Sequence, residues 1–168
     1  LPLASTWSVG LAADHVAHAR AAVRDHAPFR RAVATDSFAA TPAADLLTGL
    51  RGKDVLIVFV ESYGEVAVNG SAELSGVSST LDRATSQLGA AGYSTRSAWL
   101  DSPTFGGTSW LAHSTLQSGV WVDSQQRYDQ LVKTDRLTLG GAFRRAGWRT
   151  VVDGPSNKMD WPEARSSA

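Results

Sequence analysis

KDVLIVFVESYG, residues 53–64, is the stretch on which the expected fold depends. Six consecutive apolar residues, Val55 to Val60, are rich in β-branched side chains and too few to span a bilayer. Such a run predicts a strand buried on both faces, as in the middle of an α/β sheet. Ligands of open α/β sheets bind beyond the carboxyl ends of the strands, and Glu61 stands at that end. Glu61 is therefore a candidate metal ligand, with a solvated loop acid as an equally weighted alternative.

The residues after this run predict a helix and then further strands. Apolar residues recur at three- and four-residue spacing from Leu74 to Ala91, which is typical of an amphipathic helix that Gly92 closes. Residues 93–100 then predict a second strand and residues 148–152 a short third one. A strand, a helix and another strand form a right-handed unit with parallel strands. The expected fold class is therefore α/β, a parallel-sheet sandwich with helices on both faces.

The first third of the chain is expected to lead into that fold. Residues 11–33 have a helical period that Pro28 breaks or restarts, residues 35–42 are small and polar, and residues 42–49 predict a short helix. Three histidines at positions 15, 18 and 26 have no carboxylate or cysteine at usual ligand spacing, which favours solvated helix residues. We expect residues 1–50 to form a helical approach segment and linker, and residues 51–168 to form the catalytic fold.

The composition of the 168-residue chain is that of an ordinary globular protein. Sixteen basic and sixteen acidic residues cancel, which argues against a nucleic-acid partner. The chain has no cysteine, so disulfides and thiolate metal sites are excluded.

FGGTSWLAHSTLQSG, residues 105–119, is the second stretch that points to chemistry. It predicts a helix that begins near Thr108 and stops at Gly119, preceded by two glycines that let a ligand approach the backbone closely. A hydroxyl at a helix start usually caps the helix, but it can also attack an electrophile. His113 lies within this helix and is not assigned as a ligand.

Three segments together resemble the sulfatase-like members of the alkaline phosphatase superfamily, over about residues 52–162. They are VLIVFVES with Glu61, FGGTSWLAHSTLQSG with Thr108, and NKMDW at residues 157–161. The nearest branch contains lipoteichoic acid synthase and other phosphoglycerol or phosphoethanolamine transferases. The resemblance implies that Glu61 binds a divalent metal ion and that Thr108 binds the same ion and is the nucleophile, with Ser109 as the alternative.

The same resemblance implies the rest of the site and the reaction. Asn157, Lys158 and Trp161 match a segment that contacts the substrate head group. The substrate is expected to be a sulfate or phosphate ester, lipid-linked in some branches. The metal is manganese, magnesium, zinc or calcium, and the reaction runs through a covalent phospho- or sulfo-threonine. The full-length parent is expected to be extracytoplasmic and membrane-tethered, and this chain itself soluble.

The sequence also departs from the family. The family completes its metal site with an Asp-His pair, and none follows Thr108; Gly154 and Pro155 occupy the region of a further family histidine. Because tight divalent sites need three or more protein ligands, we expect this chain to be the N-terminal half of a longer catalytic domain. Its partner would be the remaining C-terminal half, and this half alone would be inactive or nearly so. A non-catalytic α/β binding or scaffold module is the alternative.

Overall fold

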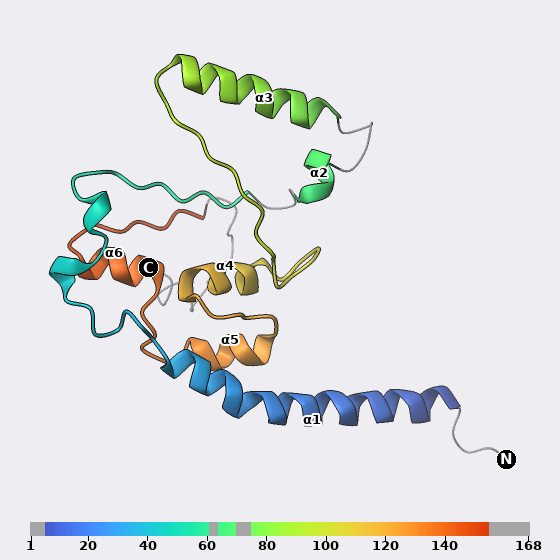
Figure 1. Ribbon diagram of the computed structural model, residues 1–168. Helices are drawn as coiled ribbons and strands as arrows, with labels where there is room; N and C mark the ends of the chain where they lie inside the picture. Colours follow the sequence, from blue (N-terminus) through green and yellow to red (C-terminus); the bar gives the residue numbers. More distant parts are fainter. Residues whose placement is uncertain (1–5, 61–63, 70–74, 155–168) are drawn as a thin grey trace. The chain divides into compact units, whose positions relative to one another are not determined.

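The computed structural model describes residues 6–60, 64–69 and 75–154, and its regular elements in this range are all helical (Figure 1). The expected parallel-sheet sandwich is therefore wrong, because no strand occurs among these residues. The elements are α1 (Thr6–Ala34), η1 (Ala43–Asp45), η2 (Thr48–Leu50), α2 (Glu65–Asn69), α3 (Ser75–Ala90), α4 (Ser109–Ser118), α5 (Gln125–Leu131) and α6 (Leu139–Arg145).

The three stretches expected to be strands are irregular. The side chains of Val55–Val60 are 41–87% exposed, and residues 93–100 and 148–152 likewise form no ladder. The physical reason is that a run of β-branched residues indicates only that the side chains would pack well on a pleated, buried surface. A strand also needs a neighbouring strand to pair with, and the described part of the chain supplies none.

The chain divides into two compact units, which we describe separately. The smaller unit, Val55–Ser102, contains α2 and α3, which pack against each other. The Ser78 hydroxyl on α3 donates a hydrogen bond of 2.6 Å to the Val68 carbonyl on α2. No described residue of this unit is buried, so the unit has no core of its own in the described range.

The larger unit, residues 1–54 and 103–168, holds the hydrophobic core. The core joins the carboxyl-terminal part of α1 to α4 and α5, and α5 runs beside α1 in Figure 1. Its buried side chains are Phe29, Val33, Leu111, Val122, Tyr128 and Leu131. The packed part of this long helix is therefore its carboxyl-terminal end, where Phe29 and Val33 lie in the core.

Several expected helices are present. The helix predicted up to Ala91 is α3, and Gly92 follows it with a φ of 86°. The helix predicted for residues 108–119 is α4, which ends at Gly119 with a φ of 68°. Both glycines adopt the left-handed conformation that favours glycine after a helix. The short helix α2, at Glu65–Asn69, has no counterpart among the elements predicted from the sequence.

Pro28 does not divide α1. The helix runs through it from Thr6 to Ala34, so the expected break is absent. Within the described residues, no helix combines the length and the apolar character needed to cross a membrane.

Candidate functional site

Thr108 lies directly before α4 and has an unusual backbone conformation. Its φ is 52° and its ψ is 40°, in the left-handed region. A β-branched residue is a true outlier there, because its Cβ approaches the carbonyl oxygen too closely. The cost is about 1–2 kcal/mol. Strain of this kind is often retained at functional sites, where surrounding structure holds the residue in place.

The Thr108 side chain does not cap the helix. No side-chain capping hydrogen bond occurs at this end of α4. The hydroxyl instead donates to the carbonyl of the preceding Gly107, at 2.8 Å, and the residue is exposed. Thr108 therefore does not have the capping role that a hydroxyl at a helix start usually has.

Unlike α4, the helices α5 and α6 each begin with a side-chain cap. The Ser124 hydroxyl accepts a hydrogen bond from Arg127 N at the start of α5, and the Thr138 hydroxyl accepts one from Gly141 N at the start of α6. Both capping residues have extended backbones. Thr108 is thus the exception among these three helix starts, since its hydroxyl bonds the carbonyl of the preceding residue while the other two cap.

The other predicted site residues cannot be placed beside Thr108. Glu61, Asn157, Lys158 and Trp161 all lie outside the described residues. Ser109, the alternative nucleophile, is the first residue of α4 and is half-buried. The expected meeting of Glu61 with Thr108 therefore stays a prediction.

A complete metal site is not present in the described range. Residues 6–60, 64–69 and 75–154 contain no group of three or more His, Asp or Glu side chains that could hold an ion. Thr108 by itself offers one neutral oxygen, which is too little for a divalent cation. The described residues therefore do not fit a metal without further ligands.

Two arginines that the sequence did not single out hold the larger unit together. Arg127 on α5 makes a bidentate ion pair with Asp25 on α1, with two N···O distances of 2.7 Å. Its guanidinium also lies 5.1 Å from the centre of the Phe29 ring. The hydrogen bonds from Arg127 lower the pKa of Asp25, against the opposing effect of burial, and Asp25 in turn raises the pKa of Arg127.

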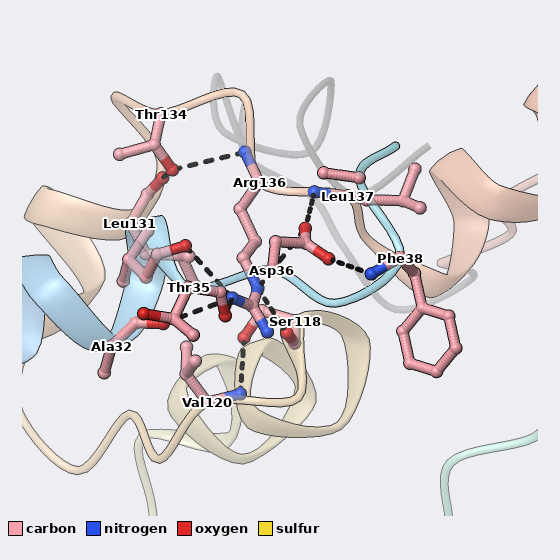
Figure 2. A network of polar contacts seen from close by, with 12 residues as sticks. Ala32, Thr35, Asp36, Phe38, Ser118, Val120, Leu131, Thr134, Arg136 and Leu137 are labelled. Carbon is pink, nitrogen blue, oxygen red and sulfur yellow. Dashed lines mark hydrogen bonds and ion pairs between the residues drawn. The ribbon is translucent and has the colours of Figure 1, made fainter. Parts of the chain in front are cut away.

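Arg136 is the centre of a second network (Figure 2). Its Nη1 donates to the carbonyls of Ala32, Val33 and Thr35 at the end of α1, at 2.8–3.2 Å. Its Nε donates to the carbonyl of Ser118 at the end of α4, at 2.9 Å. Arg136 therefore satisfies carbonyls that have no partner within either helix and places a positive charge at two negative helix ends.

Asp36 completes this network. Its carboxylate accepts hydrogen bonds from the N–H groups of Phe38 and Leu137, each 3.0 Å long, and lies 3.8 Å from Arg136 Nε. Burial alone would raise the pKa of Asp36, but these N–H groups and the charge of Arg136 outweigh it and lower the pKa.

A cavity of about 50 Å³ lies between α4, the end of α5 and the loop that carries Arg136. A cavity of this size is large enough for water, which needs about 10–15 Å³. Two helix ends and Asp36 already compensate the charge of Arg136. The cavity is therefore a poor site for an anionic substrate.

No protein-family model matches the chain, and comparison with curated proteins and with solved structures likewise finds no match. The resemblance to the sulfatase-like enzymes therefore rests on the residues of the chain alone.

Proposed function

We propose that this chain supplies the nucleophile of a metal-dependent sulfatase-like hydrolase or phosphotransferase, and that Thr108 is that nucleophile. The observation that carries the proposal is the conformation of Thr108. A β-branched residue is held at a φ of 52° with its hydroxyl exposed and with no capping role. The motif in which it lies, residues 105–119, independently resembles the nucleophile segment of that family.

The chemistry follows from what a threonine can do. The Thr108 oxygen attacks phosphorus or sulfur of the ester and displaces the alcohol, leaving a covalent phospho- or sulfo-threonine. Water or an acceptor alcohol then cleaves this intermediate. The first N–H groups of α4 have no acceptor within the helix, so they can take up charge on the non-bridging oxygens.

The proposal includes one divalent cation, manganese, magnesium, zinc or calcium, with Glu61 and Thr108 as its ligands from this chain. When bound, such an ion would lower the pKa of the Thr108 hydroxyl and so make it a better nucleophile near neutral pH. No Asp-His pair follows Thr108 in the sequence, and we propose that the remaining ligands belong to the C-terminal half of the catalytic domain. The ester substrate would be contacted by Asn157, Lys158 and Trp161. This substrate can be lipid-linked, and the full-length parent is proposed to be extracytoplasmic and tethered to the membrane.

The test is metal-dependent hydrolysis of p-nitrophenyl phosphate and p-nitrophenyl sulfate, by this chain and by a longer protein that contains it. We expect the longer protein to hydrolyse one ester and to lose that activity with Thr108→Ala. Thr48→Ala, the same change at another exposed threonine of the same unit, serves as the control and leaves the rate unchanged. Equal rates for Thr108→Ala and wild type would refute the nucleophile. A longer protein that is inert with all four metals would favour a non-catalytic binding module.

A further inference from the structure

Three exposed arginines on α1 form a basic stripe, which we define as Arg20, Arg24 and Arg31. With about 3.6 residues per turn, Arg24 lies about 40° and Arg31 about 20° around the helix axis from Arg20. The stripe therefore runs along one side of α1 for about 16 Å, at a rise of about 1.5 Å per residue. Arg30 is exposed as well, but it lies about 100° around the axis from Arg31 and is not part of the stripe.

The stripe lies opposite the packed side of α1. Phe29 and Val33 mark that side, since both are buried in the core. Arg20 precedes Phe29 by nine residues, and Arg24 precedes Val33 by nine residues. Nine residues correspond to about two and a half turns, which places two side chains about 180° apart around the axis. The packing of the core therefore leaves the stripe facing solvent.

The charge of the stripe is not balanced by acidic residues of the same helix. None of its guanidinium groups forms an ion pair with another described residue, whereas those of Arg127 and Arg136 do. The acidic residues of α1 are Asp14 and Asp25. Asp25 is paired with Arg127 on the packed side, and Asp14 lies about 120° around the axis from Arg20. The stripe is therefore a patch of positive charge, although the basic and acidic residues of the whole chain cancel.

A straight patch of positive charge about 16 Å long complements a flat anionic surface. A membrane that contains acidic phospholipids favours adsorption by about fivefold for each Lys or Arg that lies near it. The attraction decays over a Debye length of about 8–10 Å, so charges farther from the surface contribute little. A nucleic acid is a less suitable partner, because the neutral chain gains no long-range attraction to a polyanion.

We propose that the basic stripe of α1 binds the headgroups of anionic phospholipids, so that α1 lies along a membrane surface with its packed side turned away. Together the three arginines favour adsorption by about 100-fold over a helix without them. Adsorption of this strength is weak for a free chain, but a membrane tether of the kind proposed for the full-length parent raises the effective concentration of the surface. The stripe does not involve Thr108, so this proposal and the proposed reaction can fail separately.

The experiment measures how much of the chain sediments with lipid vesicles at millimolar lipid. Vesicles of phosphatidylcholine with about 30% phosphatidylserine are compared with vesicles of phosphatidylcholine alone, in about 0.1 M and about 0.5 M NaCl. We expect binding to the anionic vesicles at the lower salt concentration and none to the neutral vesicles. Most of this binding should be lost at the higher salt concentration, because the Debye length then falls to about 4 Å.

Variants then locate the contact. The stripe variant combines Arg20→Gln, Arg24→Gln and Arg31→Gln, and its partition coefficient on anionic vesicles should fall by about 100-fold. Arg24→Gln alone should cost about fivefold, and it tests the stripe with a single change at the surface. The matched control removes the same charge from three exposed positions elsewhere and should bind nearly as wild type does. It combines Arg83→Gln, Arg96→Gln and Arg149→Gln. Circular dichroism of each variant shows whether α-helix content is retained.

Four results would overturn the proposal. The first is a wild-type chain that does not bind anionic vesicles at the lower salt concentration. The second is equal binding to neutral and anionic vesicles, which would assign the contact to exposed apolar side chains such as Leu56. The third is equal binding by the stripe variant and the control variant. The fourth is a chain that binds a double-stranded DNA fragment but not anionic vesicles.

Discussion

Arg136 provides the sharpest test of how the larger unit is held together. Replacing it with Met keeps the aliphatic part of the side chain and removes every donor. The carbonyls of Val33 and Ser118, both in part-buried hydrogen bonds, then lose their partner, while those of Ala32 and Thr35 are exposed and can turn to water. An unsatisfied buried polar group costs about 1–3 kcal/mol, so two of them predict a loss of about 2–6 kcal/mol in the free energy of unfolding.

The assay is urea unfolding followed by tryptophan fluorescence, with the slope of the transition compared between variants. Arg136→Lys keeps the charge but offers donors from a single nitrogen, so it should recover only part of the loss. Arg145→Met is the matched control, because Arg145 is exposed and its hydrogen bond within the described part of the chain goes to the Ala39 carbonyl. If Arg136→Met and Arg145→Met destabilised the protein equally, the central role of Arg136 would be refuted.

The other predictions concern an ion pair and a strained residue. A double-mutant cycle of Asp25→Ala and Arg127→Ala, measured by urea unfolding, should give a coupling of about 1–2 kcal/mol, because the pair is bidentate and only partly exposed; a value near zero would contradict this. The pKa of Asp25 is lower in the folded chain than its usual value of 3.8, so ionised Asp25 stabilises the fold at pH values above 3.8. This contribution is lost as the pH falls through the lowered pKa of the folded chain. Asp25→Asn should therefore make the free energy of unfolding depend less steeply on pH in acid. Thr108→Gly should raise the free energy of unfolding by about 0.5–1 kcal/mol, since glycine adopts a positive φ without strain, whereas Thr108→Ala should give no such gain.

The sequence predicts the structural features that depend on neighbouring residues better than those that depend on contacts between residues far apart in the chain. The helices α3 and α4 follow from local signals, namely apolar spacing and the closing residues Gly92 and Gly119. The expected strand at residues 55–60 fails because pairing is a long-range property that a single apolar run does not contain.

The same distinction applies to the candidate site. The motif around Thr108 is visible in the sequence, but its left-handed backbone is not, because threonine rarely adopts it. The contacts of Arg127 with Asp25, and of Arg136 with the end of α1, join residues about one hundred positions apart and leave no local pattern.

The most direct test of the central claim is the covalent intermediate itself. A longer protein that contains this chain would be mixed with the preferred ester and a divalent metal, quenched with acid within the first turnovers, and mapped by peptide mass spectrometry. The account predicts a phosphoryl or sulfuryl group on Thr108 that requires the metal and is absent from Thr108→Ala. Turnover of the ester with an adduct on another residue, or with no adduct on Thr108 at any time, would contradict it.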